Sequence, residues 1–496
     1  MKQSQRIFKN ILAGGIGVGL GGLLQLVAIV FIARSVGVAE FGTYSFILAF
    51  AMFFQLLADS GLSNILVREL ATKPERMAEI LGAAVSLVWL LTALVGLLIV
   101  AAVPFLHFDF EIKALAALMG VATLAQFHAT VYGSVLRSQE DNEWHALGFL
   151  LHKIVFCVCV FAGLKAGLGL LGIVLAHLVP NLFQWAFYRE FIKRRYARPK
   201  LRTDFAEWKY LLTHSIPVGG ATMLRLFAQQ LDVIILTWLS DLHTVGLFSG
   251  PYRISQALRF IPQTMSLPLY PVYSRLAVQP ETRPQFHAAY ERSVKAFLVV
   301  GCAVATVFVT CAAHLITLLL GPQFRDAEPA MQLLGLAFVP FFVASPFPFL
   351  LTALHEQRFL FRTTVLSLAL RVTLNFTLIP RFGFLGPSLA FLIAEIALLA
   401  VAVNRLWNLG FPLALGRMLW RPILASTALA AILHLSRGHS HAWFFLAAVA
   451  GALTYAALIF KLGTFSREEL ALAREGLGFL KPLVAKWTKQ PHLKTT

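Results

Sequence analysis

Eight charged side chains lie inside long apolar stretches of the sequence, six or more residues from either end. A charge at the centre of a lipid bilayer costs at least about 2.5–3.5 kcal/mol on insertion scales, so such residues are usually functional. Five of the eight are cations and three are acids: Lys153, Arg225, Arg253, Arg259, Arg371, Asp59, Asp232 and Glu395. The excess is positive, and arginine grips phosphate or pyrophosphate in bidentate fashion. We therefore expect the five cations to line a cavity that binds an anionic substrate.

Each of these residues also has a structural interpretation. Lys153 and Arg253 are close enough to the ends of their apolar stretches to reach the membrane surface. Asp232 can neutralise the arginine two helical turns before it. Asp59 can cap or pack, and Glu395 can take up a proton or form a hydrogen bond between helices. The three acids are therefore candidates for ion coupling or for charge compensation, and both roles stay open.

The elements that must carry these residues are membrane-spanning helices. The chain is 58% hydrophobic and only 13% charged, whereas a soluble domain has about 25% charged residues. About 20 apolar residues are needed to cross the hydrocarbon core. Fourteen stretches meet this need, which predicts an all-α integral membrane protein: 11–33, 43–66, 79–103, 114–136, 146–164, 169–188, 215–238, 246–271, 296–320, 330–353, 361–380, 384–403, 417–435 and 442–460.

The basic residues between these stretches and at their ends predict the orientation. Cytoplasmic loops carry an excess of Lys and Arg. Alternate connecting segments hold 31 of these residues on one side and six on the other. Both termini are therefore predicted to be cytoplasmic. The net charge of +18 is explained by this topology, so we expect no nucleic-acid partner.

Short sequence matches relate the two halves of the chain. Gly42–Ser45 (GTYS) matches Gly246–Ser249 (GLFS), and Leu136–Glu140 matches Leu354–Arg358. Ile11–Gly15 and Gly169–Gly172 match Ile216–Gly220 and Gly383–Gly386 in the same order. The offset of six spans predicts a parallel repeat of two pseudo-symmetric six-helix lobes, with two further C-terminal helices. The predicted organisation is an N-lobe (1–190), a basic cytoplasmic linker (191–209), a C-lobe (210–410), two more spans (411–461) and a tail (462–496).

The sequence shows no pattern for catalysis or cofactor binding. It has no phosphate-binding nucleotide loop, no metal-ligand spacing and no nucleophile elbow. We therefore expect no enzymatic activity, no cofactor and no metal. In the tail, Ser466–Glu469 has the pattern of a capping box, followed by apolar residues at helical spacing. A basic amphipathic helix on the inner membrane surface and a solvated tail are both compatible with it.

Three stretches resemble the polysaccharide flippases of the multidrug/oligosaccharidyl-lipid/polysaccharide exporter superfamily. They are Ala33–Glu69, Ser215–Pro271 and Leu374–Ser388. The resemblance runs from the N-terminus to about residue 410. It implies a flippase that moves undecaprenyl-pyrophosphate-linked oligosaccharide repeat units across the bacterial inner membrane, for O-antigen in lipopolysaccharide, capsule or exopolysaccharide. It also implies membrane lipids and the polymerase and chain-length proteins of polysaccharide assembly as partners.

Three other functions remain open at the level of sequence. A peptidoglycan-precursor flippase also has fourteen spans and a cationic cavity. A drug or cation exporter of the same superfamily is expected to have twelve spans and an acidic cavity. A membrane scaffold or enzyme of polysaccharide assembly is the remaining alternative.

Overall fold

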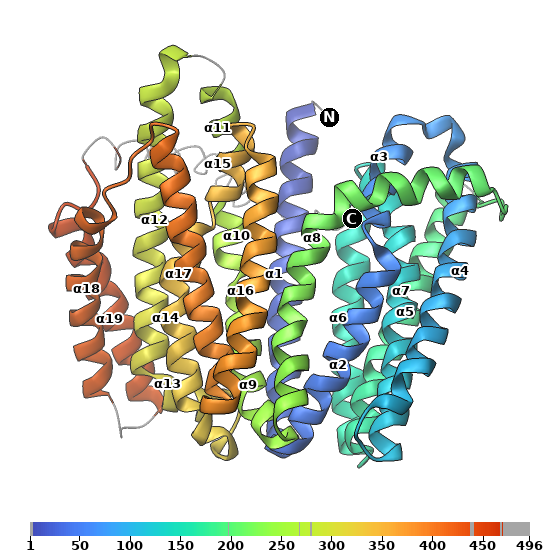
Figure 1. The fold of residues 1–496 in the computed structure, drawn as a ribbon, viewed down its shortest axis with the longest axis horizontal. Helices are drawn as coiled ribbons and strands as arrows, with labels where there is room; N and C mark the ends of the chain where they lie inside the picture. The colour runs from blue at the N-terminus through green and yellow to red at the C-terminus, as the bar shows by residue number, and fades with distance from the viewer. Residues whose placement is uncertain are drawn as a thin grey trace, which may run out of the picture.

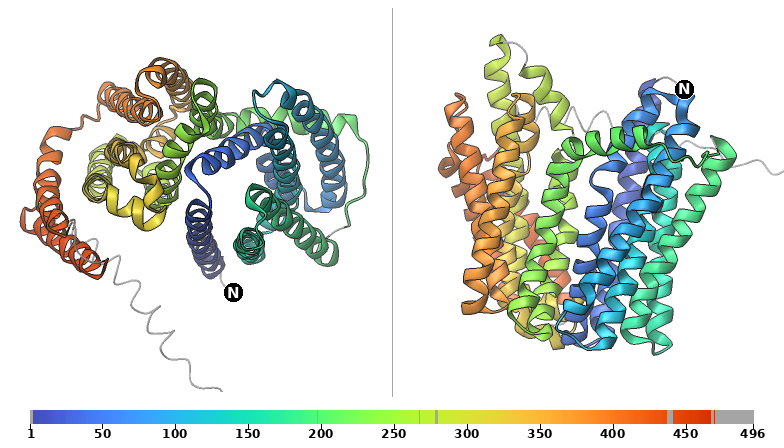
Figure 2. Two further views of the ribbon diagram at one scale, coloured as in Figure 1. Left: turned by 90° about the horizontal axis from the view of Figure 1, so that it is seen from below. Right: turned by 45° about the vertical axis from the view of Figure 1, so that its right-hand side comes forward.

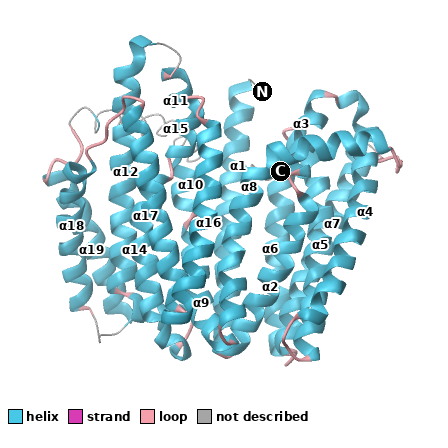
Figure 3. Ribbon diagram, in the orientation of Figure 1, coloured by secondary structure: helices cyan, strands magenta, loops and turns pink. Residues whose placement is uncertain are grey.

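The computed structural model describes residues 3–196, 198–266, 268–277, 280–436, 441–466 and 469, without the side chains of 3–18, 216–222, 225, 280 and 441. The described residues form helices joined by short turns, with no strand among them (Figure 3). The first half contains α1 (Gln3–Ser35), α2 (Val38–Asp59), α3 (Leu62–Thr72), η1 (Pro74–Arg76), α4 (Met77–Ala102), η2 (Val103–Phe105), α5 (Phe110–Ser138), α6 (Asn142–Lys165) and α7 (Gly169–Arg195).

The second half continues with helices of more varied length. They are α8 (Phe205–Leu239), α9 (Leu242–Leu258), α10 (Phe260–Ser266), α11 (Leu269–Leu276), η3 (Pro280–Thr282), α12 (Arg283–Thr310), α13 (Ala312–Leu319), η4 (Pro322–Ala327), α14 (Glu328–Ala344), α15 (Phe347–Ala353), α16 (Gln357–Phe382), α17 (Leu385–Asn408), α18 (Leu415–Leu435) and α19 (His441–Lys461).

The described residues include 11 helices long and apolar enough to cross a membrane. The chain is therefore a multi-pass α-helical membrane protein. The apolar parts Gly19–Ser35 and Leu226–Leu239 are shorter than this limit, and α9 to α11 divide one predicted span into three helices. Each of the fourteen predicted spans falls on a helix or a broken helix, but the count of fourteen stays a prediction.

Several predicted spans are broken where the backbone cannot continue as a helix. In the second span, the first helix ends before Ser60 and Gly61, which have φ values of 40° and 87°. This left-handed backbone conformation stops an α-helix. The eighth span breaks after Leu258, because Pro262 has no N–H to donate to the Leu258 carbonyl. The break places Arg259 at the junction of α9 and α10.

The helices stand side by side, with α2 to α7 at one side of the molecule and α12 to α17 at the other (Figures 1 and 2). Between these groups, α2 packs against α8 and α9. The pair α18–α19 packs on α12 at the outer edge. The division into two related six-helix lobes stays a prediction.

The two copies of the Gly-x-aromatic-Ser motif pack against each other. A Cβ added to Gly42 would lie 1.8 Å from the carbonyl oxygen of Leu242, and one added to Gly246 would lie 2.0 Å from that of Val38. The contact is reciprocal, because each glycine meets the residue four positions before the other. Small residues allow membrane helices to approach this closely, so the motif brings α2 and α9 into backbone contact.

Gly246→Ala is expected to weaken this contact strongly. The added methyl group has no space beside the Val38 carbonyl, and overpacking of this kind typically costs about 1–3 kcal/mol. The thermal unfolding midpoint of the purified protein in detergent should fall clearly. Gly22→Ala is the matched control, because a Cβ on Gly22 meets nothing within 4 Å. Equal midpoints for the two variants would contradict this role of Gly246.

A second pair of matched segments forms the same turn, but in a different register. Glu140 and His355 have φ values of 58° and 60°. The N–H groups of the next residues, Asp141 and Glu356, donate to Leu136 and Leu351. Glu140 therefore corresponds to His355, whereas the sequence match of Leu136–Glu140 with Leu354–Arg358 was shifted by three residues. Backbone conformation, and not residue identity, relates these two turns.

The predicted capping box at the start of the tail is confirmed. The Ser466 N–H donates to Glu469 (2.7 Å), and the Glu469 N–H donates to the Ser466 hydroxyl (3.2 Å). Glu469 also forms ion pairs with Lys295 (3.2 Å) and Arg292 (3.8 Å) of α12. The predicted amphipathic helix beyond Glu469 lies outside the described residues.

Candidate functional site

A buried ion pair joins α8 to α16. Arg371 forms a hydrogen-bonded ion pair with Asp232, and their side chains are only 8% and 1% exposed. Asn375, one turn after Arg371, donates to the other carboxylate oxygen of Asp232 at 2.9 Å. The Asp232 carboxylate neutralises the charge of Arg371. Arg371 is therefore one partner of a buried ion pair and not a free cation that lines a cavity. Within the described residues, Arg371 Nε and Asn375 Oδ1 are buried without a hydrogen-bond partner.

Arg259 lies next to this pair and is held by aromatic rings. Its guanidinium carbon is 5.0 Å from the ring centre of Phe391, 5.1 Å from that of Phe341 and 5.9 Å from that of Tyr252. Arg371 lies over the same Phe391 ring at 5.0 Å. Among the described residues, no acid forms an ion pair with Arg259 and no hydrogen bond occupies its guanidinium. This half-buried cation is therefore fixed by stacking, with its N–H groups available to a ligand.

Glu395 completes this group from α17. It lies one turn after Phe391 and is near enough to Arg259 and Arg371 to interact electrostatically with both. The two arginines and the two acids Asp232 and Glu395 thus form one polar group between α8, α9, α16 and α17. The aromatic rings around it lower the local dielectric and strengthen these interactions.

A second group forms where α2 meets α9. Arg253 donates from Nε to the Ser45 hydroxyl at 3.3 Å, and its guanidinium carbon lies 4.9 Å from the ring centre of Tyr44. The Tyr44 hydroxyl is 3.1 Å from Nε2 of His177 on α7. Arg253 therefore lies at the contact between the repeated motifs, where it is half-buried and stacks on an aromatic ring.

Lys153, another of the predicted cavity cations, lies apart from these arginines. Lys153 lies in the middle of α6 and donates from Nζ to Oε1 of Gln25 on α1 at 2.8 Å. Its ammonium group is also 5.3 Å from the ring centre of Phe149. The side chain of Arg225 lies outside the described residues. The structure thus brings two of the five predicted cations, Arg259 and Arg371, into one group.

Asp59 has a local role in the structure. Its carboxylate accepts hydrogen bonds from the backbone N–H of Ser63 at 3.1 Å and from the Ser63 hydroxyl at 3.2 Å. These bonds satisfy the first turn of α3 just after the break at Ser60 and Gly61. In this arrangement Asp59 fixes the bend between α2 and α3.

Several partners in these groups were absent from the sequence prediction. They are Gln25, Tyr44, Phe391 and Asn375. Asn375 had a detectable signal, because it follows Arg371 by four residues and so lies on the same helical face. For the others, only the packing of distant helices reveals the contact.

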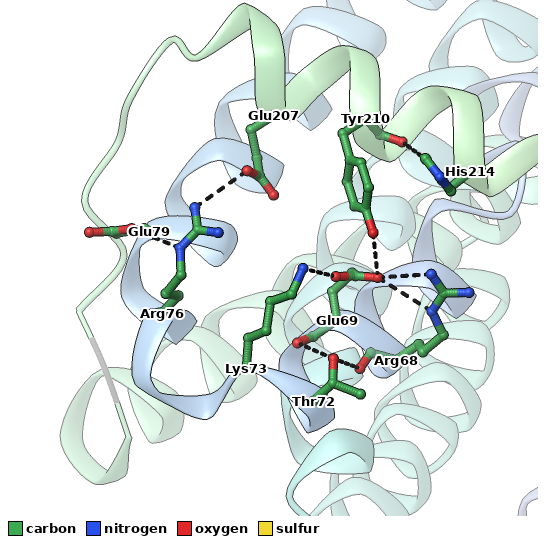
Figure 4. A network of polar contacts seen from close by, with 9 residues as sticks. All are labelled: Arg68, Glu69, Thr72, Lys73, Arg76, Glu79, Glu207, Tyr210 and His214. Atoms are coloured by element: carbon green, nitrogen blue, oxygen red, sulfur yellow. Dashed lines mark hydrogen bonds and ion pairs between the residues drawn. The ribbon is translucent and has the colours of Figure 1, made fainter.

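A separate polar network ties α3 to the start of α8 (Figure 4). Glu69, whose side chain is 3% exposed, pairs with Lys73 (2.7 Å) and Arg68 (3.1 Å) and accepts a hydrogen bond from the Tyr210 hydroxyl (3.0 Å). Asp204 caps α8 by accepting from the N–H groups of Ala206 and Glu207. The predicted linker therefore ends in the first turns of α8, which lie across the end of the first-half helices (Figure 1).

Tyr210→Phe is expected to lower the stability of this junction. The substitution removes one hydrogen bond to the buried Glu69 carboxylate, a loss of about 1–2 kcal/mol. Tyr290→Phe is the matched control, because the buried Tyr290 hydroxyl has no hydrogen-bond partner among the described residues. In thermal unfolding in detergent, Tyr210→Phe should lower the unfolding midpoint, whereas Tyr290→Phe should leave the midpoint at the wild-type value. The reverse order would refute the assigned contact.

The comparisons with known proteins agree with this architecture. Residues 7–277, more than half of the chain, match the family model described as polysaccharide biosynthesis protein. The chain belongs to this family. None of the curated proteins matches the sequence.

Solved membrane transporters share the fold. The lipid II flippase MurJ, in an inward closed conformation, has a TM-score of 0.75 at 14% identity, over 91% of this chain and 99% of that chain. An inward-facing multidrug resistance MATE transporter of the MOP superfamily has a TM-score of 0.62 at 15% identity, over 79% and 95%. A MOP superfamily transporter from Pyrococcus furiosus has a TM-score of 0.56 at 18% identity, over 81% of this chain and 94% of that chain. This polysaccharide biosynthesis protein therefore has the fold of the MOP transporters.

Proposed function

We propose that the protein is a flippase for undecaprenyl-pyrophosphate-linked oligosaccharide repeat units in the bacterial inner membrane. Both termini lie in the cytoplasm, and the two predicted lobes alternate between inward- and outward-open states. The exported units serve the synthesis of O-antigen, capsule or exopolysaccharide. The observation that carries this proposal is Arg259, a cation held by three aromatic rings at a helix break, with its guanidinium unoccupied among the described residues.

In this proposal Arg259 binds the pyrophosphate of the substrate. A guanidinium has a fork of N–H donors that matches phosphate oxygens, and the surrounding rings restrict its rotamers before the substrate arrives. Arg371 is a positioning residue, because its charge is balanced by Asp232. While no substrate is bound, Glu395 offsets part of the positive charge of Arg259. This lowers the free-energy cost of keeping that cation partly buried.

The family supports this function over export of cationic drugs. Its model is described by polysaccharide biosynthesis, and a cationic drug would be repelled by Arg259. A peptidoglycan-precursor flippase is the second candidate, because the MurJ structure shares the fold over 91% of this chain. In both candidate functions the transported lipid contains a pyrophosphate, so the proposed role of Arg259 is the same in each. The expected assembly partners are the polymerase and chain-length proteins.

A reconstituted assay separates these functions. The purified protein is placed in vesicles with a fluorescent polyprenyl-pyrophosphate oligosaccharide, and a glycosidase outside the vesicles reports translocation. We expect protein-dependent cleavage of the initially protected half of the substrate. Unlabelled lipid II should compete weakly; strong competition would favour the peptidoglycan-precursor function. No translocation of either lipid, together with drug efflux from cells, would refute the flippase.

A further inference from the structure

A cavity lies at the end of the molecule opposite the Glu69 network, between the α4–α5 connection and the start of α9. Its volume is about 710 Å³, and its lining includes Phe105, His107, Asp109, Lys113 and Leu242. Binding sites for small molecules typically have about 300–1,000 Å³. This cavity is separate from the Arg259 group, because Leu242 begins α9 and Arg259 follows its last residue, about 25 Å further along at 1.5 Å per residue.

The cavity combines aromatic surface with charged and polar side chains. Phe105 is 82% exposed, whereas Phe108, also in the lining, is fixed by its ring contact with Phe46 of α2 at 5.1 Å. Asp109 occupies the N-cap position of α5, but its carboxylate makes no capping hydrogen bond. Lys113 donates to the Pro104 carbonyl at 3.3 Å and so holds the connection in its bend.

This chemistry fits a sugar better than a lipid tail or a phosphate. An acyl chain would cover the His107 and Asp109 side chains without offering either a hydrogen bond, at a cost in free energy. A phosphate would be repelled by the Asp109 carboxylate. A pyranose has a C–H face that can cover an aromatic ring and a rim of hydroxyl groups that can bond to charged side chains and backbone carbonyls.

We propose that this cavity binds a sugar residue of the transported glycan. The inference rests on the proposed flippase function and assigns the glycan and the pyrophosphate to different places. A substrate whose pyrophosphate lies at Arg259 reaches the cavity only with an extended chain of several sugars along α9. The cavity therefore makes the protein sensitive to the length and identity of the sugars far from the lipid.

The test compares two phenylalanines of the same connection. Phe105 lines the cavity, whereas Phe110 is equally exposed, at 85%, and does not. The probe is the soluble oligosaccharide released by mild acid from the host's own surface polysaccharide, and binding to the full-length protein in nanodiscs is followed by saturation-transfer NMR. Phe105→Ala should raise the dissociation constant about tenfold, equivalent to roughly 1.4 kcal/mol. Asp109→Asn should also weaken binding, and Phe110→Ala should leave it unchanged.

The outcomes separate this inference from the proposed function. Equal dissociation constants for Phe105→Ala and Phe110→Ala would overturn the cavity assignment, because a ring in the lining would then contribute no more to binding than a ring outside it. Translocation of the lipid-linked substrate without any binding of the soluble oligosaccharide would overturn it too. Binding that depends on Phe105, in a protein that translocates no lipid-linked glycan, would support the sugar site and refute the flippase.

Discussion

Asp232→Ala is expected to reduce the stability of the protein by about 3–5 kcal/mol, the usual cost of breaking a buried ion pair by removing one partner. The substitution leaves the Arg371 guanidinium, 8% exposed, without its counter-charge, and it also removes the acceptor of the Asn375 amide. A smaller folded fraction after purification and a much lower unfolding midpoint should follow. Both are measured by fluorescence-detected size-exclusion chromatography after heating.

The double variant Asp232→Ala/Arg371→Met is the control for this prediction. Methionine removes the unpaired charge and fills part of the space, so the double variant should be more stable than the single one. If the single variant unfolds at the wild-type temperature, or the double variant is less stable than the single, the ion pair does not have the role assigned here. The comparison also tests whether Arg371 positions the site or binds the substrate. If Arg371 is only a positioning residue, the double variant should retain partial translocation.

Arg259→Gln is expected to abolish most translocation while leaving the protein folded. The charge-assisted contact to a phosphate is worth roughly 2 kcal/mol, so translocation at low substrate concentration should fall by about 30-fold. Arg259→Lys should give an intermediate rate, because it keeps the charge but loses the planar group that stacks on Phe391 and Phe341. The rate is measured per folded molecule in the vesicle assay.

Lys165→Gln is the matched control for Arg259. Lys165 also lies over an aromatic ring, that of Phe161 at 4.8 Å, but it is exposed at the end of α6. Its substitution removes one positive charge and one ring contact without touching the group around Arg259, so translocation should be unchanged. Wild-type rates in Arg259→Gln would remove Arg259 from the binding site and leave the pyrophosphate without an assigned partner.

The sequence was sufficient for the class of fold and for the most informative residues. Apolar length predicted membrane helices, and the repeated Gly-x-aromatic-Ser motif pointed to α2 and α9, which meet at Gly42 and Gly246. The charges within apolar stretches included both arginines of the group around Phe391. These features are encoded locally, because apolar length, small residues and intramembrane charge each have a cost or a geometric consequence at their own position.

The sequence did not show which charges would neutralise one another. Arg225 is two turns from Asp232 on one helix and was the expected partner, yet Asp232 pairs with Arg371, 139 positions later. Asp59, a candidate for ion coupling, accepts its hydrogen bonds from Ser63 beside a helix break. Spacing along one helix ranks neighbours on that helix only, whereas a buried charge takes the partner that packing supplies.

The charged residues inside apolar stretches thus have two levels of explanation. The sequence by itself determined that the chain spans a membrane many times, that it carries an excess of intramembrane cations and that it resembles polysaccharide flippases. Only the tertiary structure decided that Arg371 is neutralised, that Lys153 pairs with Gln25 and that Arg259 is left with aromatic neighbours. The reason is physical: composition fixes the cost of placing a charge in the membrane, but the helices packed around that charge determine what offsets the cost.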